Sequence, residues 1–298
     1  MDSIFNNYVF LGEIGKGYTS TIYKVIHKKL GYTCAIKILK DKLCEKENIV
    51  MCNEFYDTSE LLLRIGSSQH KNIIQCYDYY IINGYAVMEL EYIDGYNLTE
   101  YLALENGFIK FHEIQKLLID ISSALAFCHS INKGRIIHND IHFENIMRRK
   151  SGGYILLDFA SAFDTECIYM HNGDPEYRPP EKWNYGSAHL GLIGPYSDIY
   201  SFGITLFKFM TGRVPFVYNK NYSSFLAESE LCCKHRTERV PDIFEFRKNA
   251  YEKKYVGKLY KKDYPKWIEM LIKKSLSKNI DDRFCDGTEL YNYVKNML

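Results

Sequence analysis

The chain has 298 residues, a net charge of +1, and ordinary shares of apolar (46%) and charged (25%) side chains. It is long enough to form a core without crosslinks, and its near-zero charge creates no global field for nucleic acid or anionic lipid. The nine cysteines show neither paired zinc spacing nor a disulfide framework. No apolar run of about 18 residues predicts a membrane span. We therefore expect a cytoplasmic, intracellular protein without a nucleic-acid partner; the sequence does not indicate its oligomeric state.

The first third of the chain predicts mainly strands. Residues 8–39 include TSTIYKVIH and TCAIKIL, which are rich in β-branched and aromatic side chains. Residues 45–65 predict one helix that ends near Gly66. Residues 72–93 predict two or three strands, with an Asn-Gly hairpin signal at 83–84.

The rest of the chain is mainly helical in pattern, starting with HEIQKLLIDISSALAFCHS at 112–130. Strands that come first and helices that follow predict an α+β fold with two lobes. We expect a single domain with a β-rich N-lobe at 1–90, a hinge at 91–96 and a helical C-lobe at 97–298. Segment 217–265 is longer and more basic than a helix connection needs; it predicts a solvated face or a docking segment.

Gly15 and Gly17 lie inside strand-like sequence, in LGEIGKGYTSTIYKV. A plain hairpin turn accounts for a lone Gly-x-Gly pattern. A dinucleotide fingerprint or a P-loop requires a helix directly after the glycines, whereas STIYKVIH predicts a strand. A strand, a glycine loop and a second strand fit a lid over nucleotide phosphates.

Seven motifs in order resemble the eukaryotic-type protein kinase family, in its Ser/Thr branch. The resemblance covers roughly residues 8–295 and implies a bilobal kinase fold that uses ATP and Mg²⁺. The motifs are GKGYTSTI, CAIK, HNDIHFEN, LLDFASA, PPE at 179–181, SDIYSFGITLFKFMTGRVPF and DDRF. By the same resemblance Asp198 supports the catalytic loop, and Arg283 pairs with Glu181.

The resemblance implies roles for the charged residues of the N-lobe. Gly15 and Gly17 would cover the phosphates, and Lys37 would contact the α- and β-phosphates. A helix carboxylate would hold Lys37; Glu60 is the first candidate and Glu54 the second. A solvated helix face is the alternative reading of either glutamate.

The resemblance makes Asp140 the residue that accepts or orients the proton of the attacking hydroxyl. Asn145 and Asp158 would hold Mg²⁺, which prefers oxygen ligands. A turn or helix-capping role is the alternative for Asp158. His138 is expected to be structural.

The adenine is expected between Ile22 and Ala35 on one side and Met147 on the other, although each also fits an ordinary core position. The backbone from Glu91 to Ile93 would bind the edge of the base.

Four positions depart from the family pattern. Asn139 replaces the arginine that reads a phosphate on the activation segment, so we expect activity that does not depend on that phosphorylation. His142 replaces a lysine and is typical of small-molecule kinases that resemble aminoglycoside phosphotransferases. Asp174 replaces a threonine, and two readings stay open: a replacement pair with His142 or independent drift. Ala160 replaces a glycine and limits loop flipping.

Three functions compete. The first is a protein kinase that phosphorylates Ser or Thr in protein substrates, with Asp140, Lys37, Glu60 and His142 in catalytic roles. The second is a pseudokinase scaffold that binds partners without transfer. The third is a small-molecule kinase, which the PPE motif opposes because that motif belongs to a peptide-binding lobe.

Overall fold

The computed structural model describes residues 4–17, 19–40, 56–63, 70–106, 109–131, 135–164, 173–183, 193–243 and 264–298. Two compact units make up the chain. The first contains residues 1–94 and 157–160, and the second contains residues 95–156 and 161–298. The first is built on an antiparallel sheet and the second mainly on helices. The predicted α+β fold class is therefore confirmed.

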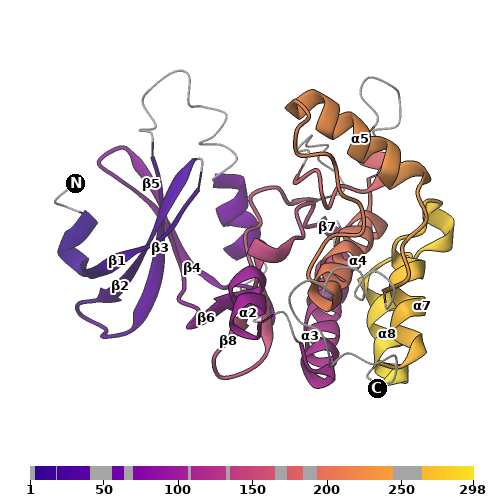
Figure 1. The fold of residues 1–298 in the computed structure, drawn as a ribbon. Coiled ribbons are helices and arrows are strands. Elements are labelled where there is room, and N and C mark those ends of the chain that lie inside the picture. Colours follow the sequence, from indigo (N-terminus) through magenta and orange to yellow (C-terminus); the bar gives the residue numbers. More distant parts are fainter. Residues whose placement is uncertain are drawn as a thin grey trace. The chain divides into compact units, whose positions relative to one another are not determined.

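Five antiparallel strands form the sheet of the first unit, in the order β1-β2-β3-β5-β4 (Figure 1). They are β1 (Tyr8–Lys16), β2 (Ser20–His27), β3 (Thr33–Leu39), β4 (Cys76–Ile82) and β5 (Tyr85–Glu91), preceded by a 3-10 turn, η1 (Ile4–Asn7). Asn83 (φ 51°) and Gly84 (φ 82°) form the turn between β4 and β5. Both have the positive φ of a type I′ hairpin, so the Asn-Gly prediction is confirmed.

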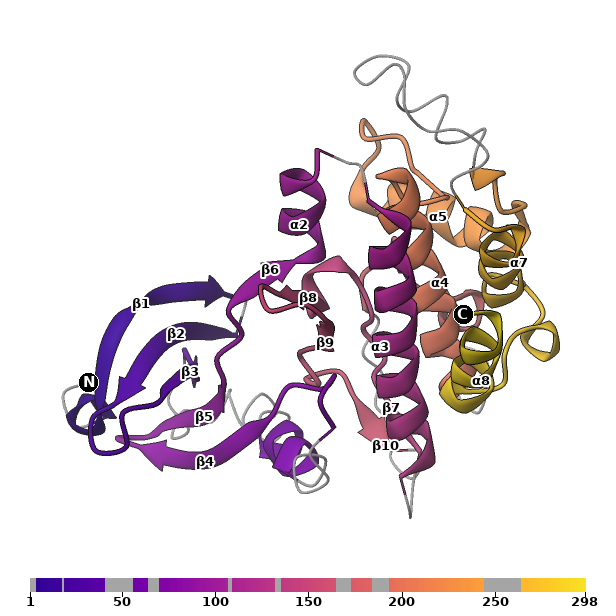
Figure 2. The ribbon, with the colours of Figure 1, turned by 90° about the horizontal axis from the view of Figure 1, so that it is seen from below.

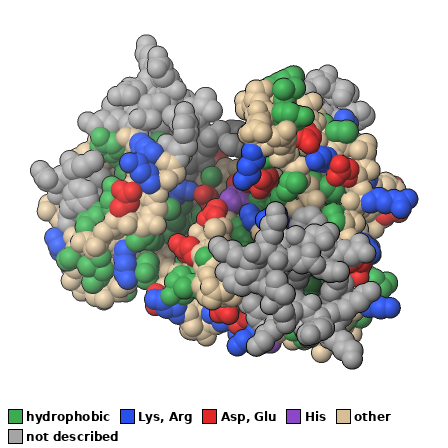
Figure 3. All heavy atoms as spheres, viewed as in Figure 1, with side chains coloured by type: hydrophobic (Ala, Val, Ile, Leu, Met, Phe, Trp, Pro, Cys, Tyr) green, Lys and Arg blue, Asp and Glu red, His purple; other side chains and the backbone are tan. Residues whose placement is uncertain are grey.

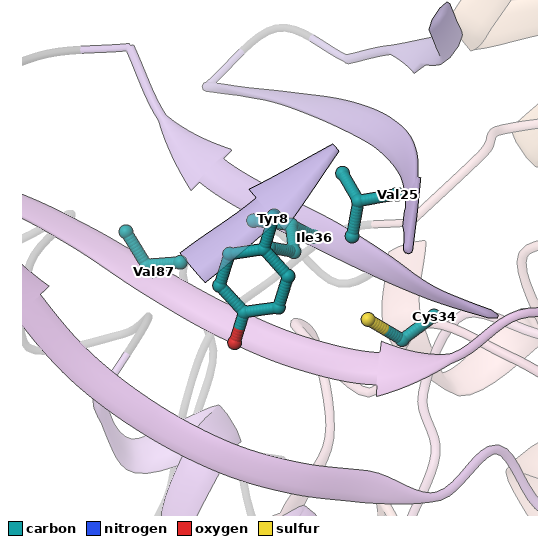
Figure 4. Packing of buried hydrophobic residues seen from close by; sticks show 5 residues of the cluster. All are labelled: Tyr8, Val25, Cys34, Ile36 and Val87. Carbon is teal, nitrogen blue, oxygen red and sulfur yellow. The ribbon is translucent and has the colours of Figure 1, made fainter. Parts of the chain in front are cut away.

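One face of this sheet buries an apolar cluster, drawn in Figure 4. Its members come from four strands: Tyr8, Val25, Cys34, Ile36 and Val87. The Tyr8 hydroxyl donates to Glu89 at 2.7 Å, which satisfies a polar group in the cluster. Residues 56–63 of this unit are helical. The remainder of the helix predicted at 45–65 lies outside the described residues.

Six helices are described in the second unit (Figure 1): α2 (Leu98–Leu104), α3 (Phe111–Ser130), α4 (Pro195–Thr211), α5 (Ser224–Thr237), α7 (Lys266–Ser275) and α8 (Gly287–Met297). Short 3-10 helices are η3 (Phe143–Asn145), η4 (Pro180–Trp183) and η6 (Ile280–Asp282). Two small sheets complete the unit: β6 (Gly95–Asn97), β8 (Ile146–Arg149) and β9 (Tyr154–Leu156) in one, and β7 (Ile136–Ile137) with β10 (Phe163–Asp164) in the other. No described helix is long and apolar enough to cross a membrane.

The core of the second unit surrounds α3 and α4. Fully buried side chains recur along α3, Cys128 among them, and nearly every residue of α4 is buried. Helix α8 runs beside α3 (Figure 2). At Gly287 the two helices approach each other closely, because a Cβ there would lie 2.3 Å from backbone atoms of Leu125 and Ala126. These contacts make α3 and α4 the frame on which the loops of this unit rest.

On the face drawn in Figure 3, the described residues carry charges of both signs side by side. This mixture agrees with the net charge of +1.

Candidate active site

The glycine loop connects β1 and β2. Gly15 lies opposite Ile22 in the register of these strands, and the Gly17 amide donates to the Ser20 carbonyl at 2.9 Å. A Cβ would meet its nearest atom at 3.5 Å on Gly15 and at 3.6 Å on Gly17, which is ordinary contact. Packing against the described residues therefore does not require glycine at either position. That the two glycines cover nucleotide phosphates stays a prediction.

Lys37, on the central strand β3, forms an ion pair with Asp158. Its Nζ lies 3.0 Å from Oδ1 of Asp158, and the lysine side chain is only 12% exposed. Asp158 has a left-handed backbone (φ 44°), and its Oδ1 also accepts from the Ala160 amide at 3.3 Å. The first unit thus brings together the predicted phosphate-binding lysine and one predicted Mg²⁺ ligand.

Glu60 lies in the helical segment 56–63, and its carboxylate accepts a hydrogen bond from the Tyr56 hydroxyl. Among the described residues, the ion pair formed by Lys37 is with Asp158. The pairing of Lys37 with Glu60 therefore stays a prediction, and Glu54 lies outside the described residues.

Ile22 and Ala35 lie on the neighbouring strands β2 and β3, where the adenine was expected. The Glu91 amide donates to the Gln75 carbonyl at 2.9 Å. That amide is committed to the main chain, so a base edge would have to use the Glu91 carbonyl and the backbone of Ile93, which follows the end of β5. Met147 belongs to β8 in the other unit.

Asp198, in the first turn of α4, holds the predicted catalytic loop. Its carboxylate is buried and accepts from the backbone amides of His138 (2.7 Å) and Asn139 (2.8 Å). The third donor is Nε2 of His129 at 3.1 Å. Nδ1 of His129 accepts from the Gly287 amide, which fixes the tautomer that can donate to Asp198. The support that Asp198 was expected to provide is confirmed.

Asp140 sits between an amide and an imidazole. Nδ2 of Asn145 donates to its carbonyl (2.9 Å) and to its Oδ2 (3.1 Å). Nε2 of His142 lies 3.3 Å from the same Oδ2. Burial acts to raise the pKa of Asp140, but the hydrogen bond and charge of His142, with the charges of His138 and Lys182, hold this pKa below its ordinary value. Asp140 is therefore ionised at neutral pH, as a proton acceptor must be.

His142 has Asp140 as its ion-pair partner, while Asp174 acts on it through charge. Burial lowers the pKa of His142, but the hydrogen bond and charge of Asp140 and the charges of Asp174 and Glu144 raise it above its ordinary value. Nδ1 accepts from the Glu144 amide at 3.2 Å, and this bond favours the neutral ring. The Asp174 carboxylate accepts from the Glu176 amide at 2.9 Å. Asp140 is thus the direct contact of His142, and the pairing of His142 with Asp174 stays a prediction.

Segment 173–183 rests directly on this loop. A Cβ on Gly173 would lie 3.3 Å from both the Asn139 carbonyl oxygen and Oδ1 of Asp140. Nη2 of Arg178 donates to the Gly173 carbonyl at 3.1 Å. Nζ of Lys182 donates to the Asn139 carbonyl at 2.7 Å. Sequence reasoning missed Lys182, because nothing in the PPE motif marks the residue after it.

Glu181 and Arg283 form the expected pair. Two parallel hydrogen bonds of 2.9 Å join the carboxylate to the guanidinium, and both side chains are almost fully buried. The Ser197 hydroxyl adds a bond of 2.7 Å to Glu181. Bidentate geometry makes this a strong, directional link between η4 and the segment before α8.

Asn145 and Asp158 carry the oxygen donors that suit Mg²⁺. Nδ2 of Asn145 is turned toward Asp140, which leaves its Oδ1 for another partner, and the Asp158 side chain is 43% exposed. No cluster of three His, Cys, Asp or Glu side chains suited to a metal occurs in the described ranges. Each donor by itself suits a hard cation; the binding of one Mg²⁺ by Asn145 of the second unit and Asp158 of the first stays a prediction.

In a comparison with known protein families, residues 8–292 match the model of the protein kinase domain. A probable serine/threonine-protein kinase of Clostridium acetobutylicum is 28% identical over 98% of this chain and 40% of its own length. Serine/threonine-protein kinase PrkC of Bacillus subtilis is 32% identical over 72% of this chain and 32% of its own. Probable serine/threonine-protein kinase PknB of Lactococcus lactis is 26% identical over 97% of this chain and 42% of its own. The chain therefore spans less than half the length of these relatives.

Proposed function

The chain belongs to the protein kinase family, and on that premise we propose that it transfers the γ-phosphate of ATP to Ser or Thr hydroxyls of proteins. The observation that carries this proposal is the geometry of the loop around Asp140. Asp198 accepts from the loop backbone at Asn139, and Asn145 and His142 contact the carboxylate of Asp140. The relatives named as serine/threonine-protein kinases support the acceptor class. The Glu181–Arg283 pair supports it further, since it builds the segment on which such kinases seat a peptide.

Asp140 would orient the attacking hydroxyl and take its proton. The new bond forms between that oxygen and the γ-phosphorus, and the bond from the γ-phosphorus to the β,γ-bridging oxygen breaks, so ADP leaves with the electron pair. Little covalent chemistry is asked of the protein, and rate comes from positioning and charge. The bonds that Asn145 and Asp198 make around Asp140 serve that positioning.

Lys37 would bind the α- and β-phosphates, exchanging its present contact with Asp158 for phosphate oxygens. Asp158 and Asn145 would hold Mg²⁺, which when bound neutralises phosphate charge. Gly15 and Gly17 would cover the phosphates with backbone amides. Each role is proposed from the family pattern together with the oxygen and nitrogen donors described above.

We further propose that activity does not require a phosphate on the activation segment. The arginine that would read it is replaced by Asn139, whose Nδ2 donates to the Ser161 carbonyl at 3.0 Å. Lys182 ties segment 173–183 to the same residue. In this proposal, the hydrogen bonds of Asn139 and Lys182 to backbone carbonyls hold the activation segment in place. In kinases that have the arginine, its contact with a phosphate does so.

The decisive experiment follows ³²P from γ-labelled ATP with Mg²⁺ onto a mixed protein substrate and onto the enzyme itself. We expect label on Ser and Thr, and Asp140→Asn should lower the rate by about 10²- to 10⁴-fold because the proton acceptor is lost. Glu238→Gln changes an exposed carboxylate of the same unit and serves as the matched control. Nucleotide binding without transfer would support a scaffold, and label on small hydroxylated molecules alone would support a small-molecule kinase.

Phosphatase treatment before the assay tests the independence from activation-segment phosphorylation. We expect treated and untreated enzyme to have equal initial rates once the phosphatase is removed. A treated enzyme that is inactive until it rephosphorylates itself would contradict this part of the proposal while leaving the kinase activity standing.

A further inference from the structure

Lys182 lies in η4, directly after Glu181, and its ammonium group reaches the loop that carries the proposed catalytic aspartate. Nζ donates to the Asn139 carbonyl at 2.7 Å. The lysine lines a small pocket of the second unit together with Asp140, Gly173 and Asp174. No family motif used above includes this position.

Asn139, the residue before Asp140, is held at three points. Its amide donates to Asp198 (2.8 Å), its side-chain Nδ2 donates to Ser161 (3.0 Å), and its carbonyl accepts from Lys182. Its φ of 70° is in the left-handed region, which costs energy in residues other than glycine. The surrounding bonds must maintain this conformation. The peptide leading into Asp140 is restrained at its carbonyl by Lys182 (2.7 Å) and, more weakly, at its amide, which donates to Nδ1 of His138 at 3.4 Å.

We propose that Lys182 is a positioning residue for phosphoryl transfer: through the Asn139 carbonyl, its cation fixes the peptide that carries Asp140. This inference rests on the function proposed above. The family pattern has a lysine two residues after the catalytic aspartate, and this chain has His142 there. Lys182 brings a positive charge to the same loop from a different segment.

The charge of Lys182 depends on pH within an accessible range. Burial lowers the pKa of Lys182 to about 8. The negative charges of Asp198, Asp140 and Glu181 act to raise this pKa, and the positive charge of Arg178 lowers it further. A neutral amine still donates, but it loses the charge assistance that strengthens its bond to a carbonyl. Positioning should therefore weaken as pH rises through about 8.

Three variants separate positioning from general stability. Lys182→Met removes the charge and the bond while keeping much of the side-chain volume, and Lys182→Arg keeps a charge that does not titrate below pH 12. Lys278→Met is the matched control: burial also lowers the pKa of Lys278 to about 8, but its Nζ lies over the Phe216 ring at 4.2 Å and donates to the Tyr200 hydroxyl at 3.5 Å. For each variant we would measure kcat and KM from pH 6.5 to 9.5, ATP binding and thermal unfolding.

We expect Lys182→Met to lower kcat at pH 7 by roughly 10- to 100-fold, because small displacements of a reacting group are costly, with KM for ATP little changed. The wild type and Lys278→Met should lose activity as pH rises through about 8. Lys182→Arg should keep its activity over that range. A Lys182→Met enzyme with wild-type kcat, or a pH step that persists in Lys182→Arg, overturns the proposal.

The outcomes also separate this proposal from the proposed function. A wild type that transfers no phosphate refutes the function, and amide hydrogen exchange then decides the role of Lys182. Faster exchange of the Asn139 amide in Lys182→Met than in Lys278→Met supports positioning, and equal exchange refutes it. If Lys182→Met does not fold, the pH profile of Lys182→Arg remains decisive.

Discussion

Glu113, in the first turn of α3, accepts the hydrogen bonds that hold a buried polar cluster together. Nε and Nη2 of Arg148 each donate to one of its carboxylate oxygens at 2.7 Å, and the Tyr154 hydroxyl donates at 2.7 Å. The hydrogen bonds of Arg148 have the largest effect on the pKa of Glu113 and lower it. Burial acts to raise this pKa, the hydrogen bond of Tyr154 lowers it further, and the result is a pKa of about 2. One carboxylate thereby fastens α3 to both β8 and β9.

This cluster predicts acid-sensitive stability. Because the pKa of Glu113 is lower in the folded state than the ordinary 4.5, its contribution is present above about pH 5 and is lost as pH falls toward 2. The shift corresponds to about 3 kcal/mol at neutral pH. In urea unfolding, Glu113→Gln should lower the free energy of unfolding at pH 7, and the difference from wild type should shrink at pH 4 and again at pH 3.

The exposed Glu238 provides the comparison for this measurement, since Glu238→Gln should leave the free energy of unfolding nearly unchanged at all three pH values. A constant difference between wild type and Glu113→Gln across the pH range would contradict the assignment of the carboxylate as the group that titrates.

At the scale of elements, the start of α8 against α3 is set by a glycine. A methyl group on Gly287 would lie 2.3 Å from backbone atoms of Leu125 and Ala126, and backbone cannot move aside as a flexible side chain can. Gly287→Ala should therefore destabilise the protein by about 1–3 kcal/mol or more, even though alanine is the better helix former. Thermal and urea unfolding measure this directly.

Thr288→Ala tests the same helix turn without the clash, because Thr288 is exposed. We expect a change within about 0.5 kcal/mol for this control. Since the Gly287 amide also donates to His129, which contacts Asp198, Gly287→Ala should lower activity as well as stability. Equal stability of the two variants would show that the helices can separate at little cost.

At the scale of the whole molecule, nucleotide binding should stabilise the fold through linkage. With MgATP at about 100 times its dissociation constant, the free energy of unfolding should rise by about 2.7 kcal/mol. Asp158→Asn removes a proposed Mg²⁺ ligand, so the variant should gain less from Mg²⁺ than the wild type does. Thermal shifts with ATP and either Mg²⁺ or EDTA provide the measurement; identical shifts in Mg²⁺ and EDTA would contradict a metal-dependent site.

The sequence predicted those features that depend on local pattern. The Asn83–Gly84 hairpin requires positive φ that these two residue types tolerate, and β-branched residues marked the strands. The resemblance to the kinase family implied that Asp198 supports the predicted catalytic loop, and its two hydrogen bonds with backbone amides of that loop agree.

Features that depend on contacts distant in sequence were not predictable from pattern. Lys182 and Asn139 are 43 residues apart, and Arg148 and Glu113 are 35 apart. The residue types alone do not reveal these contacts, because it is the fold that brings Lys182 to the Asn139 carbonyl and Arg148 to the Glu113 carboxylate. His142 shows the same limit, because its direct contact with Asp140 rather than Asp174 follows from the loop geometry.

The buried cysteines offer a way to observe each unit separately. Cys34 and Cys76 lie in the first unit and Cys128 lies in the second, all with less than 7% of their surface exposed. Burial raises the pKa of Cys34 and of Cys76 to about 12, and raises that of Cys128 as well. These thiols are therefore shielded from alkylating reagents until their own unit opens. Pulsed alkylation followed by peptide mass spectrometry would report the opening rate of each unit and reveal whether nucleotide couples the two.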